Sequence, residues 1–429
     1  MLSHPDSAFP VVKVEIDPSK RGQEIRGFGG NLTEASILSI NALPTDTRAA
    51  LMQQLFNPKS GLALNFLRVP VGASDFVDAN LGFYTYSDLQ PGQTDPKMKL
   101  FSLGRDQKTV AFLKEAKAIN PSLHIMLSPW SAPDWMKTGT LDPHINGRLA
   151  PEHYDDYAKY LVKTVRVYEL NGIPVDAVTV VNEPLFFDNQ WYISMPMTTE
   201  EQMAFIAKSL GPAFAKAKIG ARILGLDHNY ENAGEGVRMM DDPKVRRYLG
   251  GMAFHCYGGV PEQMQVLRDK YPSVTLYQTE CTTLNDDDYY KATLGSWLRA
   301  QVLQPNVAAA LAWNLALFAP GERPSGLDQA CGACTGLVTI KKSGEFVLGP
   351  EIYGLAHASR FLRPHAHAVA TTQASHEGVT SQGYLNSDGE RVLIMTNESE
   401  TSLSVVLREA GRGEALLELG PKSAATIVW

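Results

Sequence analysis

Apolar runs of strand type recur along the first three quarters of this chain. Near-continuous apolar runs are typical of strands in a parallel sheet that is covered by helices. The eight runs are Gly27–Gly30, Leu64–Pro70, His124–Pro129, Ala177–Asn182, Arg222–Leu226, Met252–His255, Val274–Glu280 and Ala308–Leu317. Stretches with helical spacing lie between them, at 106–119, 154–169 and 199–218. In the last of these, Thr199 is the expected N-cap and Pro212 marks a break. The alternation predicts an α/β fold, a (β/α)8 TIM barrel with long loops.

The chain changes character after about Phe361. Short strand-type stretches with turn signals between them indicate a small antiparallel β-sandwich. They lie at 378–381, 391–397, 402–408 and 424–429. The alternating run Val11–Ile16 is expected to pair with this sheet. We therefore predict N-terminal sandwich strands in residues 1–25, the barrel in 26–360 and the C-terminal sandwich in 361–429.

The net charge limits the kinds of partner that this chain is expected to bind. The formal net charge is −7, with both signs mixed along the chain, which argues against a nucleic-acid surface. No stretch approaches the roughly 20 apolar residues of a membrane span. The first residues lack the apolar core of a signal peptide, so the chain is expected to be cytoplasmic unless a leader has been removed, and secreted or periplasmic if one has. A monomer or weak homo-oligomer is expected.

The cysteines and one acidic run carry weaker signals. Four cysteines in 429 residues do not make a disulfide framework. Cys331 and Cys334 form a CxxC without a second pair to complete a zinc site, so a local disulfide or two plain thiols are expected. The run Asp286–Asp288 lacks the ligand spacing of an EF-hand and is expected to be a solvated loop. We expect no metal and no cofactor.

The residues that end the strands should build the site, because barrel active sites lie at the carboxyl ends of the strands. These residues are Asn31, Arg68, Trp130, Asn182, Glu183, Asp227, His228, Asn229, His255, Tyr257, Glu280, Trp313 and Asn314. Aromatic rings can stack on the C–H faces of a sugar, and amides and carboxylates take its hydroxyls. No Walker loop or GxGxxG motif is present to hold a phosphate. The set therefore suits a neutral polyol, and the expected partner is a carbohydrate or glycolipid substrate.

Two of these residues, Glu183 and Glu280, are candidates for paired carboxylate chemistry. One carboxyl group must donate a proton while the other stays ionised. Arg68 could hold a carboxylate ionised from the second sphere of the site, which favours Glu280 as nucleophile and Glu183 as acid/base. A retaining reaction predicts carboxyl groups about 5–5.5 Å apart.

Several motifs occur in the order and spacing of one known family. They are Leu67-Arg68-Val69-Pro70 followed by Asp75-Phe76, then Ser128–Lys137, Asn182-Glu183-Pro184, Phe254–Tyr257, Thr279-Glu280-Cys281 and Trp313–Leu317. Across roughly residues 22 to 365 the chain resembles glycoside hydrolase family 30, with its nearest resemblance to the glucosylceramidase branch. One departure is Cys256, where the family often has Trp. Another is the loop from Phe318 to Thr335, which does not align with the animal glucosylceramidases.

The resemblance implies a retaining β-glycosidase with acid/base Glu183 on the fourth strand and nucleophile Glu280 on the seventh. By position, Asp75, Trp130, Asn182 and Trp313 match residues that hold the sugar in the first subsite. His255 and Tyr257 are further candidates for substrate contact.

The expected function is hydrolysis of β-D-glucosides, such as glucosylceramide-like or aryl and alkyl glucosides. An endo-acting β-1,6-glucanase of the same family is the alternative, and an inactive carbohydrate-binding barrel is a weaker one.

Overall fold

The computed structural model describes residues 9–142, 144–284, 302–304, 307–324, 331, 333–372, 376–409 and 411–429. The acidic run Asp286–Asp288 lies outside the described residues.

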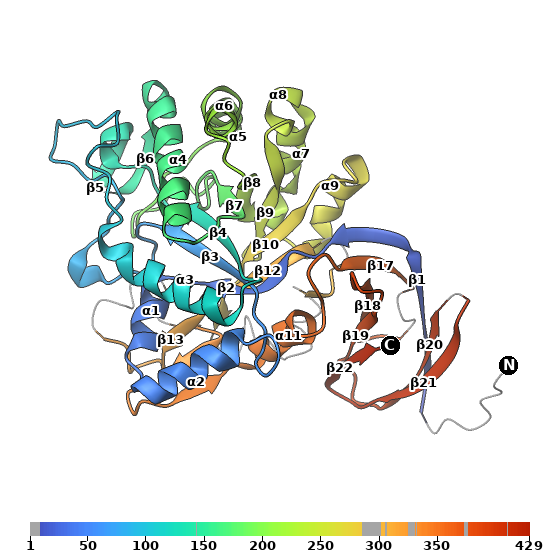
Figure 1. The fold of residues 1–429 in the computed structure, drawn as a ribbon. Helices are drawn as coiled ribbons and strands as arrows, with labels where there is room; N and C mark the ends of the chain where they lie inside the picture. The colour runs from blue at the N-terminus through green and yellow to red at the C-terminus, as the bar shows by residue number, and fades with distance from the viewer. Residues whose placement is uncertain are drawn as a thin grey trace.

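A closed barrel of eight parallel strands forms the larger part of the molecule (Figure 1). Its strands are β2 Gly27–Asn31, β3 Phe66–Val71, β4 His124–Pro129, β7 Ala177–Thr179, β8 Arg222–Asn229, β9 Leu249–His255, β10 Leu276–Glu280 and β12 Val307–Ala312. They follow one another around the ring in chain order. All eight predicted runs supply barrel strands, so the predicted barrel is confirmed. The eighth run differs in extent, because Ala316–Phe318 forms a separate strand, β13.

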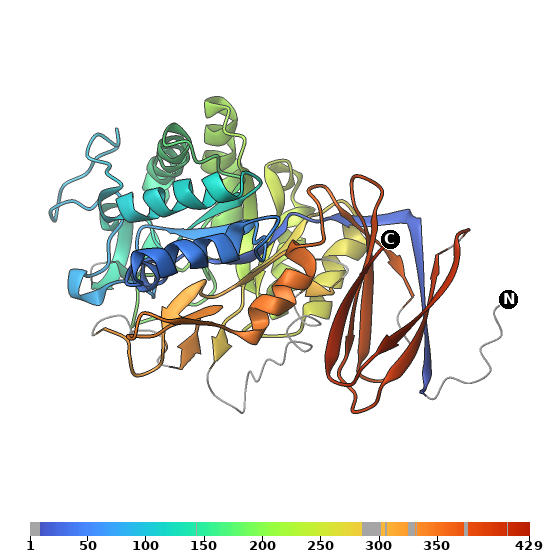
Figure 2. The same ribbon diagram turned by 60° about the horizontal axis from the view of Figure 1, so that its bottom comes forward.

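Helices surround the barrel (Figures 1 and 2). They are α1 Glu34–Asn41, α2 Thr45–Phe56, α3 Gln107–Ile119, α4 Tyr154–Leu170, α5 Thr199–Phe205, α6 Gly211–Ala217, α7 Ala233–Asp241, α8 Pro243–Arg246, α9 Gln265–Lys270 and α11 Pro350–Ser359. The predicted N-cap Thr199 is wrong by one residue, because Thr198 caps α5 in a capping box with Glu201. Pro212 does not end the helical stretch. A π-helical turn at Ile206–Leu210 leads into α6, and Pro212 lies in the first turn of α6. Proline lacks a backbone N–H and is tolerated in a first turn.

The barrel interior is layered. An apolar layer includes Phe66, Met126, Ala177, Ala253 and Tyr277, all buried. Side chains alternate along a strand, so the residue two positions further on points to the same side. Those residues are Arg68, Ser128, Thr179, His255 and Thr279, again all buried. The strand period therefore places a polar layer on top of the apolar one, at the carboxyl ends of the strands.

A seven-stranded sheet lies beside the barrel and curls on itself (Figure 2). Its strands are β1 Val11–Glu24, β17 His367–Thr371, β18 Val379–Leu385, β19 Arg391–Asn397, β20 Leu403–Glu409, β21 Gly413–Leu419 and β22 Ser423–Val428. β1 lies between β17 and β20, so the first strand completes a sheet built from the end of the chain. The pairing is antiparallel except between β1 and β20. Val12, Val14 and Ile16 alternate into its core.

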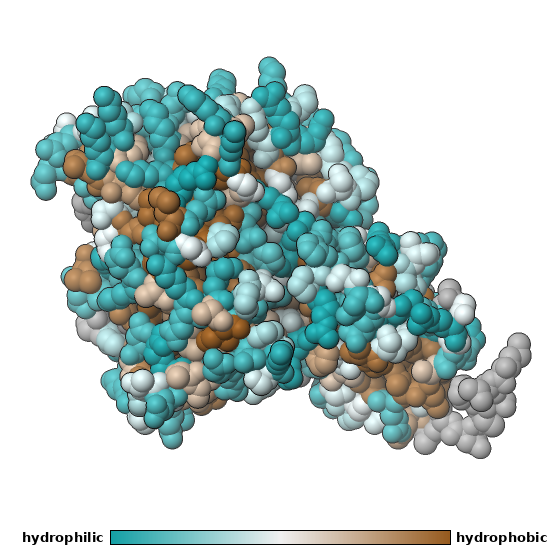
Figure 3. Space-filling view, viewed as in Figure 1, coloured by the Kyte–Doolittle hydropathy of each residue, from teal (hydrophilic) through white to brown (hydrophobic). Residues whose placement is uncertain are grey.

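Short strands complete the loops above the barrel. β5 Lys137–Asp142 pairs with β6 Ile145–Leu149, and β11 Thr283–Leu284 pairs with β14 Cys334–Thr335. β13 pairs with β15 Val338–Ile340, which also pairs with β16 Phe346–Leu348. Within the described part of the chain, no helix is both long and apolar enough to span a membrane. The face in Figure 3 is largely hydrophilic, with small apolar patches.

Candidate active site

The two predicted glutamates meet above the polar layer of the barrel. Glu280 is the last residue of β10, and Glu183 lies just beyond the end of β7. One oxygen of each carboxylate and one nitrogen of His255 all lie within 4.8 Å of one another. Glu280 is buried, and the side chain of Glu183 is 16% exposed. Two carboxylates from distant parts of the sequence thus lie close together at a partly exposed site.

Arg68 anchors the hydrogen bonds beneath them. Its Nη1 donates to Glu280 at 2.7 Å, and its Nη2 donates to Asp227 at 2.8 Å. It also donates to Asn31, Ser128 and Asn182. Arg68 is fully buried, so its charge needs the two carboxylates beside it. The predicted place of Arg68, next to a carboxylate, is the one the structure shows.

Glu280 accepts a second hydrogen bond, from the hydroxyl of Tyr257 at 2.8 Å. Burial and the charge of Glu280 raise the pKa of Tyr257 well above its usual value, so this hydroxyl remains a donor. The two donors, Arg68 and Tyr257, hold the two oxygens of Glu280 separately.

Glu183 is oriented from β8 and β9. Its backbone lies in the left-handed region, with a φ of 45°, and its N–H donates to the carbonyl of Asp227 at 3.1 Å. Its carboxylate lies 3.2 Å from Nδ1 of His255 and 3.4 Å from the hydroxyl of Tyr192. A non-glycine residue in this backbone region is costly, and such residues cluster at functional sites.

Asp227 connects these groups. Its carboxylate accepts from Arg68 and Thr279, and it lies 3.1 Å from Nε2 of His255. β8 is irregular here, with positive φ at Leu226 and Asp227 and a register shift against β9. Sequence reasoning placed Asp227 at a strand end but gave it no role, because a regular strand does not predict which side a bulged residue faces.

The two glutamates differ in pKa direction. Burial raises the pKa of Glu280, against the opposing charges of His255 and Arg68. Burial would also raise the pKa of Glu183, but the hydrogen bond and charge of His255 lower it overall. Burial would lower the pKa of His255, yet the surrounding carboxylates, Glu280 and Asp227 among them, raise it to about 10. The free site therefore carries its mobile proton on or beside His255.

The charges of Glu280 and Glu183 affect the pKa of Asp75. Burial, followed by the charges of Glu280 and Glu183, raises the pKa of Asp75 well above its usual value. Its Oδ1 is buried and has no hydrogen-bond partner among the described residues. A carboxyl group kept neutral is a donor as well as an acceptor.

The predicted tryptophans lie together. The rings of Trp130 and Trp313 stack, with 5.4 Å between their centroids, and the Arg68 guanidinium lies 4.9 Å from the Trp130 ring. The side chain of Asn182 accepts from Arg68 at 2.6 Å. Both tryptophans and Asn182 are buried. Sugar contact by these three, by Asp75, by His255 and by Tyr257 stays a prediction.

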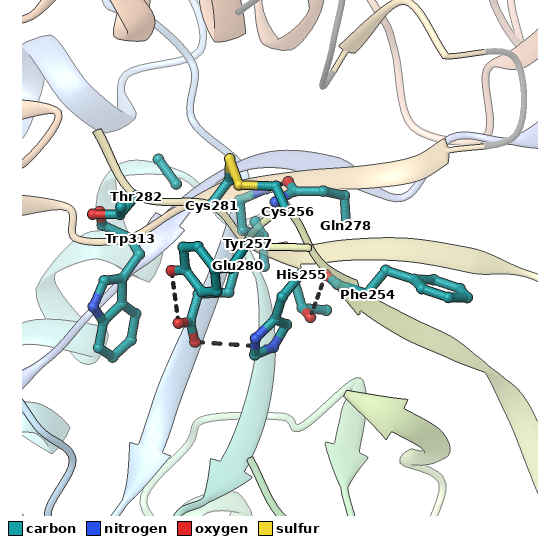
Figure 4. Close-up of a disulfide and its surroundings, with 12 residues drawn as sticks. Phe254, His255, Cys256, Tyr257, Gln278, Glu280, Cys281, Thr282 and Trp313 are labelled. Carbon is teal, nitrogen blue, oxygen red and sulfur yellow. Dashed lines mark hydrogen bonds and ion pairs between the residues drawn. A yellow bond between two sulfur atoms is a disulfide. The ribbon is translucent and has the colours of Figure 1, made fainter. Parts of the chain in front are cut away.

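A disulfide that the sequence did not predict borders this site. Cys256 and Cys281 are bonded, and Figure 4 shows the bridge on one side of the strand ends, with Glu280, Tyr257 and His255 on the other. Cys331 and Cys334 are also bonded, which is the local disulfide that was one of two expectations. The view that four cysteines make no disulfide framework is therefore wrong. The signal was present, since Cys256 and Cys281 directly follow adjacent barrel strands.

Glu183, His255 and Glu280 form the one group in the described residues with three metal-ligand atoms close together. The Arg68 guanidinium already binds Glu280 at 2.7 Å, and a metal ion there would meet its positive charge. The geometry suits proton transfer and nucleophilic attack better than metal binding.

Comparison with known proteins identifies the family. The model of the glycosyl hydrolase family 30 TIM-barrel domain matches residues 25–362, and that of the family's beta sandwich domain matches residues 365–427. The chain belongs to glycoside hydrolase family 30. It is a glycosidase on a TIM barrel with a β-sandwich, as the resemblance implied.

Proteins named as endo-1,6-glucanases and as glucosylceramidases are both similar to this chain. An endo-1,6-beta-D-glucanase of Neurospora crassa is 31% identical over 94% of this chain and 85% of its own. The lysosomal acid glucosylceramidase of Mus musculus is 26% identical over 93% of this chain and 79% of its own. The solved structure of the endo-beta1,6-glucanase BT3312 superposes with a TM-score of 0.88 at 28% identity, covering 97% of this chain and 93% of that one.

Proposed function

We propose that this family 30 enzyme is a retaining β-glucosidic hydrolase whose substrate is a β-1,6-linked glucan. The observation that carries the retaining mechanism is the approach of a Glu183 oxygen to within 4.8 Å of a Glu280 oxygen. Inverting enzymes keep their carboxyl groups about 6.5–9.5 Å apart to admit a water molecule. The short approach supports direct attack on the sugar.

Glu280 is the proposed nucleophile. Arg68 and Tyr257 donate to it at 2.7 and 2.8 Å, and we take these two donors to keep it ionised at neutral pH although burial raises its pKa. A carboxylate oxygen attacks the anomeric carbon, the glycosidic C–O bond breaks, and a glycosyl ester forms on Glu280.

Glu183 is the proposed acid/base. The acid role needs a proton on Glu183, whereas the pKa directions of the free site place it on His255. The proton can pass from His255 to Glu183, because Nδ1 of His255 lies 3.2 Å from Oε1 of Glu183. Transfer along this line turns imidazolium and carboxylate into imidazole and carboxylic acid. Glu183 then protonates the leaving oxygen, and later takes a proton from the water that hydrolyses the ester.

The relatives support the substrate. The Neurospora crassa endo-1,6-beta-D-glucanase is 31% identical to this chain and the mouse glucosylceramidase 26%, and the endo-beta1,6-glucanase BT3312 superposes with a TM-score of 0.88. We therefore favour a β-1,6-glucan as substrate over the glucosylceramide-like glucosides that the sequence predicts. A glucosylceramide-like substrate remains the second candidate, on the similarity to the mouse enzyme.

Product analysis tests the proposal. The purified enzyme is incubated with a β-1,6-glucan and, separately, with glucosylceramide in detergent. A ladder of β-1,6-linked oligomers supports endo action on the glucan. Glucose released from the glucan without oligomers would contradict endo action. Turnover of glucosylceramide with an intact glucan would make the second candidate correct.

A further inference from the structure

The Cys256–Cys281 disulfide joins the two strand ends that carry Glu280 and its neighbours. Cys256 lies between His255 and Tyr257 in the sequence, and Cys281 directly follows Glu280. Tyr257 donates to Glu280, and His255 contacts Glu183. His255, Tyr257 and Glu280 are thus each one peptide bond away from a bridged cysteine.

One extra residue interrupts the hydrogen-bond ladder between the two strands at this point. β9 and β10 pair Gln278 with Phe254 and Glu280 with His255, so Thr279 is an extra residue that breaks the register. Past the break, the N–H of Cys256 donates to the carbonyl of Glu280 at 3.2 Å. A bulge disrupts the ladder locally, so main-chain pairing holds this end of β10 less firmly than the rest of the strand.

The residue after Glu280 is instead held from both sides. The carbonyl of Cys281 accepts from the N–H of Trp313 at 2.8 Å, beyond the end of β12. Its side chain is bonded to Cys256, beyond the end of β9. Side chains alternate along a strand, and the bridge lies on the side away from the Glu280 carboxylate (Figure 4). The disulfide can therefore fix the backbone of Glu280 without contacting the sugar.

We propose that the Cys256–Cys281 disulfide is a positioning element that fixes Glu280 and Tyr257 for attack on the anomeric carbon. The inference rests on the proposed role of Glu280. When a phosphine reduces the bridge, the S–S bond breaks, each sulfur gains a proton, and the phosphine becomes its oxide with an oxygen from water. The ladders around the rest of the barrel stay in place, but Cys281, the residue after Glu280, keeps only its hydrogen bond to Trp313.

A displacement of about 1 Å in a reacting group costs about 100-fold in rate. We therefore expect kcat to fall about 10- to 100-fold when the bridge is absent, with KM changed by less than about three-fold. Because the first step is slowed, kcat should depend more steeply on the leaving group. Disulfides persist in oxidising compartments, and there the enzyme would be fully active.

The test compares two double variants on aryl β-glucosides with leaving groups of graded acidity. Cys256→Ser/Cys281→Ser should show the loss of kcat and the steeper leaving-group dependence. Cys331→Ser/Cys334→Ser removes the other bridge and serves as the matched control, with kcat near that of the wild type. Equal kcat in both double variants and the wild type would overturn the proposal.

In the Cys331→Ser/Cys334→Ser variant, the Cys256–Cys281 disulfide can also be removed and restored after the protein has folded. This variant retains a single disulfide, so treatment with a phosphine should expose two thiols per chain and lower kcat by the same factor. Reoxidation with glutathione disulfide should restore kcat. Two exposed thiols with unchanged kcat and an unchanged near-ultraviolet circular dichroism spectrum would contradict the positioning role. A wild-type enzyme inactive on every β-glucoside would instead overturn the proposed function.

Discussion

Arg68 donates a hydrogen bond from Nη1 to Oε2 of Glu280 at 2.7 Å, with the arginine side chain fully buried and the glutamate side chain 6% exposed. The same guanidinium binds Asp227 at 2.8 Å. The guanidinium thus pairs with two carboxylates inside the barrel, where an unpaired charge is costly. Stability and the ionisation of the proposed nucleophile therefore depend on the same residue.

Arg68→Met should destabilise the protein by about 3–5 kcal/mol, because it removes the guanidinium that pairs directly with the buried Asp227 and Glu280 carboxylates. Chemical unfolding measures this loss. Arg238→Met is the matched control, since Arg238 pairs with Glu200 and Glu235 at a half-exposed surface position. That change should cost no more than about 1 kcal/mol. Similar losses of stability in the two variants would show that the buried ion pairs of Arg68 stabilise the protein no more than the exposed ion pairs of Arg238.

Glu183→Ala should slow hydrolysis of glucosides with poor leaving groups by about 10²–10⁴-fold, because the leaving oxygen then departs without a proton. Substrates with activated leaving groups should still form the glycosyl ester. Azide should then accelerate turnover and yield a β-glucosyl azide, which nuclear magnetic resonance identifies. An α-glucosyl azide, or no azide product, would contradict the acid/base assignment.

Tyr257→Phe should move the acidic limb of the pH profile of kcat/KM to higher pH. Burial already raises the pKa of Glu280, and the Tyr257 hydrogen bond is one of the interactions that lower it. Losing that donor raises the pKa further, and the nucleophile must be ionised, so activity is lost earlier as pH falls. A hydrogen bond to a charged group contributes about 1.5–3 kcal/mol, which sets a shift of about one to two pH units.

The control for this shift is Tyr157→Phe. Tyr157 is fully buried, and its hydroxyl donates to the carbonyl of Val180 at 2.9 Å and not to a carboxylate. Its acidic limb should match that of the wild type. If both variants shift alike, the limb reports general destabilisation and not the ionisation of Glu280.

Regular strands made most of the fold predictable. Apolar runs showed all eight barrel strands, and strand-end positions pointed to Glu183, Glu280, Arg68 and Tyr257, which the structure places together. The irregular positions were not predictable in the same way. The backbone of Leu226 and Asp227 departs from regular strand geometry, and this brings the Asp227 carboxylate to Arg68 and His255. Tyr192 reaches Glu183 from a loop, whose path the period of the sequence does not determine.

The Cys256–Cys281 bridge shows a different limit. Neither cysteine stands out in a count of four, and their pairing depends on β9 and β10 being neighbours in the closed barrel. Once the strand order is known, two cysteines that directly follow adjacent strand ends are an obvious pair. The fold therefore had to be known before the disulfide could be predicted.

Trapping the glycosyl-enzyme tests the central claim most directly. A 2-deoxy-2-fluoro-β-glucoside with an activated leaving group slows breakdown of the ester more than its formation, so the sugar should accumulate on the nucleophile. Peptide mass spectrometry should find one fluoroglucosyl group on Glu280, and Glu280→Gln should carry none. Label on Glu183, or steady hydrolysis of aryl β-glucosides by Glu280→Gln, would contradict the assignment.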